Sequence, residues 1–450
     1  MPEDRSPPDP NRPPDPTDGI RPVLIVGGGA AGAWQAAWLA ARGIPEIDIV
    51  EPSATLGRGL AYSAPSPDHL LNVTPGKMDA YPIPGFEGFV PWLARKRLTA
   101  PDDYHPRAVF GDYMEDVVAT VRRAAKLRHH RVRAVSIARD RHGFAVALDD
   151  GRTIAARHVV LALGNLAPHP IAPNVDDPRV IEDPWRLSPR NAAGIGRAVV
   201  AGTGLTAVDV VVSLIEASPG VHVTLTAQRP FVPPVDVVAD GWPGAEQAPV
   251  LPPSRMWRWV VDEIRKDPAH AHWVSVFEGM KTQTGRIWQA WTPAERATFA
   301  RHGLRHWLHH RHRTPPPSHR LLQRLIRAGQ VEVRRGRVAD VRPGPDGIRL
   351  TLGGRAAVAD VVVNATGPSV RPEDSPLLGA AVDAGLLCVD PLGLGLVADE
   401  TGQAIGADGR PVPGLWILGA WTRGSHFEVV PVPLLRKHAA AIAGAIRPVP

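Results

Sequence analysis

The chain of 450 residues contains a single cysteine, Cys388. One cysteine cannot form a disulfide or a C-x-x-C dithiol within the chain, and it cannot share an iron–sulfur cluster with other cysteines. The sequence therefore excludes the class of two-dinucleotide flavoproteins that reduce disulfides through a cysteine pair. It also leaves the chain without a cysteine pair that could take electrons onward.

Long apolar runs are missing as well. The most apolar stretch, residues 198–217, contains Asp209 and two glycines, and it predicts a strand, a turn and a helix rather than a membrane span. Residues 1–18 are rich in proline, aspartate and arginine, so we expect no signal peptide and predict that residues 1–19 are disordered. Together these features predict a cytoplasmic protein without stable membrane insertion.

The excess of basic charge is not gathered in one stripe. The net charge is +6, but the basic residues are spread along the chain, which argues against a nucleic-acid partner. His309, His310 and His312 lie close together without a carboxylate, so we expect no metal site there. Hydrophobic residues make up 44% and charged residues 21%, as in globular proteins, and the length allows two or three domains.

A glycine-rich turn stands near the start of the ordered chain. The segment Val23-Leu-Ile-Val-Gly-Gly-Gly-Ala-Ala-Gly32 joins a short apolar strand to glycines at G-x-G-x-x-G spacing, and residues 30–42 have helical composition. This pattern predicts a dinucleotide site with the pyrophosphate at the helix N-terminus. A second strand ends in Glu51, where a carboxylate would accept the ribose hydroxyl. The alternative is a glycine-rich turn in an unrelated α/β domain.

Two long loops, residues 56–62 and 69–80, follow this unit. Loops of this length inside a compact domain are usually functional, and their glycines would let the backbone pass close to a flat ligand. The Asn72 amide offers donors and an acceptor, which suits a flavin ring edge. In the alternative interpretation, His69 and Asn72 only cap turns. A small β-region and a strand over residues 158–164 then return to the nucleotide sheet, as an FAD domain requires.

A second dinucleotide unit follows. The strand at residues 197–201 leads into Gly202-Thr-Gly-Leu-Thr-Ala207 and a helix, and the next strand, residues 221–226, ends without an acidic residue. Gln228 and Arg229 stand there instead, which favours the 2′-phosphate of NADPH over NADH, although NADH stays open. Residues 359–367 and 413–420 are predicted as further strands that end in glycine turns.

A tryptophan-rich helical segment is predicted over residues 245–330. Its basic end, residues 307–313, is either a solvated helix end or a set of cations along the approach of an anionic ligand. We predict an α/β fold with two Rossmann-like dinucleotide-binding domains, the second inserted in the first. Residues 20–190 and 368–450 form the predicted FAD domain, and residues 191–367 form the predicted nicotinamide domain with the helical insert 245–330.

These motifs together resemble a known family. The chain is similar to FAD/NAD(P)-binding flavoproteins related to FAD-dependent urate hydroxylase and, more distantly through residues 78–93, to amine N-hydroxylating flavin monooxygenases. The matching segments are residues 27–32, 57–62, 69–73, 202–209, 288–313 and 363–368. The resemblance implies FAD, a reduced nicotinamide and oxygen insertion. Related proteins tend to carry a Ser-Arg-Arg-like run where this chain has Ala227-Gln-Arg-Pro230.

The predicted function is an FAD-dependent, NAD(P)H-consuming monooxygenase. It would hydroxylate a small molecule, expected to contain nitrogen, with O₂ through a flavin C4a-(hydro)peroxide, and the helical insert would exclude water. The alternatives are a flavin dehydrogenase or reductase that passes electrons to a quinone or another acceptor, and a flavin-binding protein without turnover. The sequence leaves the oligomeric state open.

The predicted site divides into catalytic and cofactor-binding residues. Asn72 and Lys77 are the catalytic candidates, beside the flavin N5. Val135 is expected by the adenine, and Gly164 and Gly419 close to the phosphate and ribityl chain. The complete predicted cofactor-binding set is Gly27, Gly28, Gly29, Ala30, Ala31, Gly32, Glu51, Arg58, Asn72, Val73, Val135, Gly164, Gly202, Thr203, Gly204, Thr206, Ala207, Arg229, Gly367, Gly419 and Ala420.

Overall fold

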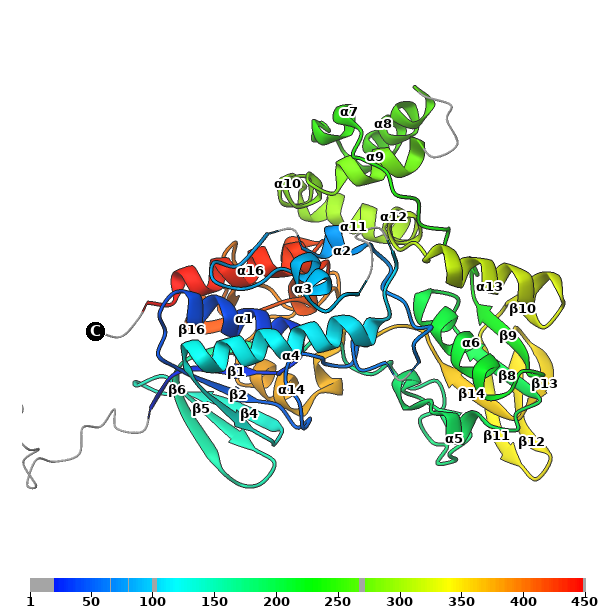
Figure 1. Ribbon diagram of the computed structural model, residues 1–450, viewed down its shortest axis with the longest axis horizontal. Helices are drawn as coiled ribbons and strands as arrows, with labels where there is room; N and C mark the ends of the chain where they lie inside the picture. Colours follow the sequence, from blue (N-terminus) through cyan, green and yellow to red (C-terminus); the bar gives the residue numbers. More distant parts are fainter. Residues whose placement is uncertain (1–19, 65, 80, 99–102, 267–271, 448–450) are drawn as a thin grey trace, which may run out of the picture.

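The computed structural model describes residues 20–64, 66–79, 81–98, 103–266 and 272–447 (Figure 1). The predicted disordered tail, residues 1–19, lies outside the described residues. Within them, no helix combines the length and the apolar character that a membrane span needs.

The first sheet is built around β1, the strand that precedes the first glycine turn. Five parallel strands lie in the order β16-β6-β1-β2-β3, and two antiparallel strands and an edge strand complete the sheet. The strand bounds are β1 Arg21–Val26, β2 Glu46–Val50, β3 Lys126–His130, β4 Ala134–Arg139, β5 Phe144–Leu148, β6 Thr153–Leu161, β15 Gln403–Ile405 and β16 Pro411–Ile417. Since β16 pairs with β6, the C-terminal part of the chain returns to the first sheet.

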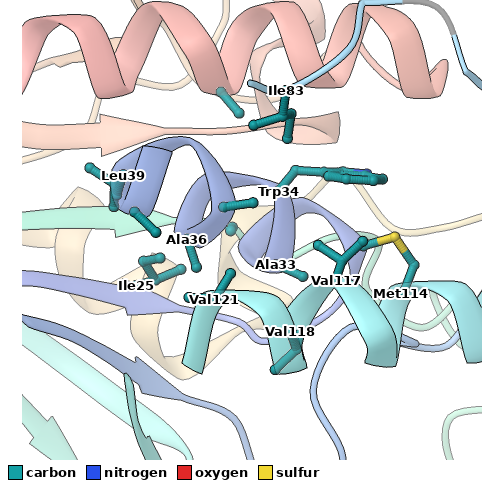
Figure 2. Packing of buried hydrophobic residues seen from close by; sticks show 14 of the residues in the cluster. Ile25, Ala33, Trp34, Ala36, Leu39, Ile83, Met114, Val117, Val118 and Val121 are labelled. Atoms are coloured by element: carbon teal, nitrogen blue, oxygen red, sulfur yellow. The ribbon is translucent and has the colours of Figure 1, made fainter. Parts of the chain in front are cut away.

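Helices cover both faces of this sheet. On one face α1 (Ala30–Ala41) packs between α4 (Arg107–Ala124) and α16 (Val432–Ala445). Figure 2 shows this layer, in which Ile25 of β1 and Trp34 of α1 lie beside Met114, Val117 and Val121 of α4. On the other face α14 (Pro376–Asp383) packs on β4. Burial of these apolar faces is the main force that holds the first unit together.

The second sheet is also parallel, in the order β10-β9-β8-β14-β7. Its strands are β7 Val180–Ile181, β8 Arg197–Ala201, β9 His222–Ala227, β10 Val331–Arg335 and β14 Val361–Asn364, and α6 (Leu205–Ala217) and α13 (Pro316–Arg327) pack against it. A three-stranded antiparallel sheet of β11 (Val338–Gly344), β12 (Gly347–Leu352) and β13 (Arg355–Ala359) stands beside it. The predicted α/β class with two Rossmann-like units is confirmed.

One boundary differs from the expectation. The sequence assigns residues up to 190 to the first unit, but β7, at Val180–Ile181, pairs with β14 in the second sheet. The second sheet therefore begins before residue 190. Two residues are too short to show a periodic pattern, so the sequence carries no signal for this strand.

The helical segment between β9 and β10 rises above both sheets (Figure 1). Its helices are α7 Pro243–Glu246, α8 Pro253–Arg265, α9 His272–Met280, α10 Thr284–Ala290, α11 Pro293–His302 and α12 Leu304–Arg311. Short elements elsewhere are α2 Pro75–Met78, α3 Phe89–Arg95, α5 Pro189–Ala192, α15 Arg423–His426, and the 3₁₀ turns η1 Pro184–Arg186, η2 Pro372–Asp374 and η3 Ala420–Thr422. We call α7–α12 the insert.

Candidate functional site

The first glycine turn stands at the carboxyl end of β1. Gly27 has a φ of +103°, and a Cβ at this position would overlap the carbonyl oxygen of Ala162, which follows β6. A Cβ on Gly32 would likewise overlap the carbonyl oxygen of Gly27, so α1 lies directly against the turn. Only glycine fits either position, as the dinucleotide motif requires.

The second glycine turn has the same construction. Gly202 has a φ of +133°, and its Cβ would overlap the carbonyl oxygen of Ala365, which follows β14. Its N–H donates to the Thr226 carbonyl at 2.8 Å, as the Gly27 N–H donates to Val50 at 2.9 Å. The two turns therefore occupy equivalent places in two parallel sheets.

Both helices that follow these turns begin in a way that fits a pyrophosphate. Helix α1 begins after Gly29 and α6 after Gly204, and neither has a side-chain cap or an acidic residue in its first turn. Their first N–H groups and the positive end of each helix dipole are thus left for an anion. Ala30 and Ala31 lie in the first turn of α1, and Thr206 and Ala207 in that of α6.

Glu51 lies directly beside the first turn. Its carboxylate accepts the Gly28 N–H at 2.9 Å and the Ser53 N–H at 2.9 Å. A carboxylate has further lone pairs, so it can also accept a ribose hydroxyl. These glycines, the uncapped helix ends and Glu51 together fit a bound dinucleotide.

Three other predicted residues reach the same edge of the first sheet. Gly164 follows β6 and Gly419 follows β16, both with positive φ, and Ala420 begins η3 directly after Gly419. Because β16, β6 and β1 are neighbouring parallel strands, their carboxyl ends bring these turns beside Gly27. Val135 is half-buried in β4, and its expected place by the adenine stays a prediction.

The loop that carries Arg58 folds over the start of α1. A Cβ on Gly29 would lie 3.3 Å from the Gly59 Cα, so the two backbones approach closely. The Arg58 guanidinium is engaged by α4, where it bonds Glu115 at 2.6 Å and also Asp112. Its expected part in cofactor binding stays a prediction.

The end of the second sheet carries two exposed guanidinium groups. Arg229 follows β9 and is exposed. Arg335, at the end of the neighbouring β10, donates to the Gln228 carbonyl at 3.1 Å. A second cation therefore comes from the adjacent strand, which the run at residues 227–230 could not reveal. Thr203 is buried and accepts the Phe231 N–H at 3.3 Å, and Gly367, with a φ of +101°, follows β14.

The catalytic candidates lie in the segment that includes α2. Asn72 and Val73 are half-buried, and no described residue forms a hydrogen bond with the Asn72 amide, which leaves it free for a ligand. The Lys77 ammonium lies 3.5 Å from the Glu278 carboxylate of α9. Lys77 thus faces the insert, a contact that sequence reasoning missed because the two residues are far apart in the chain.

Glu278 is the centre of a group of charged and polar side chains that we call the junction. The junction is formed by Lys77, Tyr104, Asp236, Glu278, Lys281 and Arg313. Arg313 bonds both Glu278 and Asp236, the latter at 2.6 Å, and the Tyr104 hydroxyl donates to Asp236 at 2.7 Å. The junction therefore joins the first unit, the start of the segment that follows β9, and the insert.

Charge and burial act against each other in the junction. Burial alone would raise the pKa of the Glu278 carboxyl, but Lys281 and Arg313 lower it to about 2. Burial, and next the charge of Arg311, lower the pKa of Lys281 to about 7, although Glu278 pulls it upward. Glu278 therefore stays ionised beside Lys281 and Arg313, and its charge partly offsets the effect of burial on Lys281.

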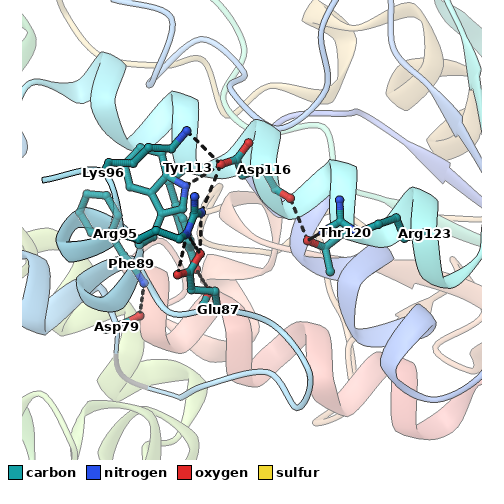
Figure 3. Close-up of polar contacts among 10 residues, drawn as sticks. Asp79, Glu87, Phe89, Arg95, Lys96, Tyr113, Asp116, Thr120 and Arg123 are labelled. Atoms are coloured by element: carbon teal, nitrogen blue, oxygen red, sulfur yellow. Dashed lines mark hydrogen bonds and ion pairs between the residues drawn. The ribbon is translucent and has the colours of Figure 1, made fainter. Parts of the chain in front are cut away.

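The segment that carries α2 and α3 is fixed to α4 (Figure 3). Asp79 accepts the N–H groups of Phe89, at 2.6 Å, and Val90 at the start of α3. The Tyr113 hydroxyl of α4 donates to the Glu87 carbonyl at 2.9 Å. These bonds hold Lys77, only two residues before Asp79, in a defined place.

Helix α6 links the second nucleotide unit to the first. Arg107, at the start of α4, pairs with Asp209 of α6 at 2.9 Å. The His69 imidazole Nε2 lies 3.0 Å from the Asp209 carbonyl and 3.0 Å from the Ser213 hydroxyl. Burial raises the pKa of the Asp209 carboxyl, although Arg107 opposes this. These contacts set how the two units face each other.

Comparisons with known proteins agree with this geometry. Residues 24–166 match the model of a family described as FAD-NAD(P)-binding. A search of curated proteins found no match.

Solved structures match almost the whole chain. The ornithine N-hydroxylase of Kutzneria sp. 744, with reduced FAD, NADP⁺ and L-ornithine, has a TM-score of 0.67 and 20% identity over 95% of this chain and 99% of its own. L-lysine 6-monooxygenase from Pseudomonas syringae has a TM-score of 0.67 and 18% identity over 95% and 99%. The bacillithiol disulfide reductase of Staphylococcus aureus has 0.59 and 12% over 95% and 98%. The chain therefore has the two-sheet fold of these structures, and residues 24–166 are similar to the family described as FAD-NAD(P)-binding.

Proposed function

We propose that the protein is an FAD-dependent, NAD(P)H-consuming monooxygenase that hydroxylates a small nitrogen-containing molecule with O₂. The observation that carries the proposal is the pair of equivalent glycine turns, Gly27 and Gly202, each followed by an uncapped helix N-terminus. Such a pair fits two dinucleotides, and similarity to amine hydroxylases supports oxygen chemistry. The nearer resemblance to urate hydroxylase stays a prediction.

The assignment of cofactors to units is part of this proposal. The first unit, with Gly27 and Glu51, would hold FAD together with the returning residues 368–450. The second unit, which we now begin at β7 rather than at residue 191, would hold the nicotinamide and carry the insert. NADPH is the proposed donor because Arg229 and Arg335 offer two guanidinium groups for a 2′-phosphate.

When bound, the two cofactors supply hydride transfer and the activation of oxygen. The chain's own part is to position them and to exclude water. Asn72 would place its free amide toward the flavin ring edge. Lys77 would act through the junction, because Glu278 of the insert is its ion-pair partner. The insert would cover the site and exclude water, which would limit the release of activated oxygen as hydrogen peroxide.

The test is oxygen incorporation. Purified protein should be yellow, release FAD on denaturation, oxidise NADPH and, with a true substrate, place one atom of labelled O₂ in the product. A protein without flavin that also binds none when offered would overturn the proposal. Fractionation of cells checks the expected cytoplasmic location separately.

A reductase is the second candidate, because a disulfide reductase shares the fold. Anaerobic stopped-flow kinetics separates the two functions. A reductase would show flavin that NADPH reduces and that an added acceptor, such as a quinone, reoxidises faster than oxygen does. A flavin-binding protein without turnover would hardly be reduced by NADPH.

A further inference from the structure

The insert encloses a cavity of about 460 Å³ that no part of the proposed cofactor chemistry uses. Binding sites for small molecules commonly have volumes of about 300–1,000 Å³. The cavity lies among α8–α12 and is closed on one side by Phe427, which belongs to the C-terminal segment of the first unit. The aromatic and methionine residues of its wall are Met256, Trp257, Phe277, Met280, Trp288, Trp291, Phe299, Trp307 and Phe427.

The lining of the cavity holds few polar side chains. No aspartate, glutamate, lysine or arginine lines the cavity, and apart from four indole N–H groups its polar groups are three hydroxyls and two imidazoles. Ser254, Thr298, His302 and His306 are exposed, so they stand at the mouth, while Trp288 and Phe277 in the wall are buried. The cavity thus has an apolar interior with a polar rim.

The cavity is tied to the segment that follows the Gly419 turn. The Trp288 indole N–H donates to the Gly424 carbonyl at 2.7 Å, and that of Trp307 donates to Glu428 at 2.8 Å. Phe427 stacks on Trp288 with a centroid distance of 4.8 Å. Phe427 also has a φ of +62°, a costly conformation for a bulky residue that tends to persist at functional sites. The cavity wall therefore continues directly into the predicted flavin side of the first unit.

We propose that this cavity is a binding site for an uncharged aromatic molecule, such as a neutral aromatic amine or nitrogen heterocycle, and that this molecule is the substrate. The second half of the inference rests on the proposed function. A charged amino acid such as L-ornithine would lose its hydration in an apolar cavity without a paired charge to replace it. The charged groups of the junction bind one another, so the lining offers aromatic stacking instead.

The experiment uses the fluorescent probe N-phenylnaphthylamine, an uncharged aromatic amine that brightens in apolar sites. The full-length protein should bind one probe molecule, indole should displace it, and L-tryptophan, the same ring with two charges, should not. Ser254→Trp/Thr298→Trp places indoles at the mouth on α8 and α11 and should weaken binding about tenfold or more. The matched control, Arg258→Trp/Arg301→Trp, adds the same side chains at exposed positions of these helices that do not line the cavity.

Equal probe binding in both double variants, or displacement by L-tryptophan as strong as by indole, would overturn the binding site. If the bound molecule is the substrate, uncharged aromatic molecules should accelerate NADPH oxidation in the wild type and in Arg258→Trp/Arg301→Trp. They should not accelerate it in Ser254→Trp/Thr298→Trp. If these molecules bind without changing the rate of NADPH oxidation, the bound molecule is not the substrate. Flavin content and basal NADPH oxidation without any ligand test the proposed function independently.

Discussion

At the scale of single residues, substitutions of Gly27 and Gly202 are expected to impair different cofactors. Gly27 packs against the carbonyl oxygen of Ala162, directly after β6, and Gly202 packs against that of Ala365, directly after β14. A methyl group at either position must therefore displace the turn. Gly27→Ala should yield protein without bound FAD. Gly202→Ala should keep FAD and lose its reduction by NADPH. Flavin absorbance and anaerobic reduction kinetics measure the two effects.

The matched control for these variants is Gly43→Ala. Gly43 has a φ of +81°, but no atom lies within 4 Å of a Cβ at that position. The variant therefore bears the backbone strain of a positive φ without the overlap, and it should retain both FAD and its reduction. If Gly202→Ala releases FAD while NADPH binds normally, the assignment of the two units is reversed.

Arg229 is expected to determine the preference for NADPH over NADH. A charge-assisted contact to a 2′-phosphate contributes about 1.5–3 kcal/mol, so Arg229→Ala should raise KM for NADPH by one to two orders of magnitude and leave that for NADH nearly unchanged. Since Arg335 lies close by, Arg229→Ala/Arg335→Ala should remove the remaining preference. Steady-state kinetics with both nucleotides checks this, and equal effects on both would remove Arg229 from the role.

The ion pairs of Glu278 are expected to stabilise the folded chain at neutral pH and to lose this effect in acid. Its pKa is about 2 in the folded chain, against an ordinary value of 4.5 for a glutamate, so its contribution is complete above pH 4.5 and is lost as the pH falls toward 2. Removing one partner of a buried charge pair costs about 3–5 kcal/mol, so Glu278→Gln should lower the free energy of unfolding by this order near neutral pH. The difference from the wild type should shrink below pH 4.5.

Urea unfolding at several pH values measures this difference. Glu332→Gln is the control, because Glu332 pairs with Arg334 at the surface and should change the free energy of unfolding by less than about 0.5 kcal/mol. A difference between Glu278→Gln and the wild type that stays constant down to pH 3 would contradict the paired state of Glu278.

The same residues show what sequence can reveal. The glycine turns could be predicted because spacing within ten residues sets their geometry. The partner of Lys77 could not, since Glu278 reaches it only after the insert folds across the first unit. Arg335 was missed for a similar reason, because parallel pairing of β9 and β10 brings it beside Gln228.

At the scale of elements, the insert could be predicted as helical but its docking could not. Trp288, Trp291 and Trp307 are buried in one cluster, and Trp259 and Trp273 pack against it. Phe427 completes that cluster from far along the chain, and no local pattern marks it. Long periodic helices and apolar parallel strands carry their own signal, whereas two-residue strands such as β7 and contacts between units depend on the complete fold.

The docking of the insert makes the next prediction. Trp288→Phe/Trp307→Phe removes two indole N–H bonds to the segment around Phe427, each worth about 1 kcal/mol. We expect the variant to keep FAD and oxidise NADPH, but to release a larger share of the electrons as hydrogen peroxide because the insert covers the flavin less well. A peroxide assay alongside NADPH consumption measures the coupling.

Trp291→Phe is the control for this pair. Its indole N–H donates to the Leu251 carbonyl at 2.7 Å, so the lost bond lies within the insert and its flank rather than between the insert and the first unit. Trp291→Phe should lose a similar free energy of unfolding per hydrogen bond, and it should release no more hydrogen peroxide than the wild type. Equal peroxide release from Trp291→Phe and the docking variant would mean that general loosening, not docking, causes the effect.

At the scale of the whole molecule, we expect the contact of α6 with the first unit to set the distance between the two proposed cofactors. Arg107 and Asp209 are both largely buried, so Arg107→Met leaves the Asp209 charge without its partner. We expect slower reduction of FAD by NADPH with unchanged FAD content, and a lower free energy of unfolding. Arg107→Met/Asp209→Asn should recover part of that stability, since no unpaired charge remains.

Arg197→Met supplies the comparison for this last prediction. Arg197 pairs with Asp360 at 3.0 Å within the second unit, and its side chain is half-exposed, so the loss should be at most about 1 kcal/mol. It should leave the rate of flavin reduction unchanged, because the pair does not join the units. If Arg107→Met reduces the flavin as fast as the wild type, the ion pair stabilises the interface without positioning the cofactors. The remaining contacts, those of His69 with Asp209 and Ser213, would then have to set the distance between the units.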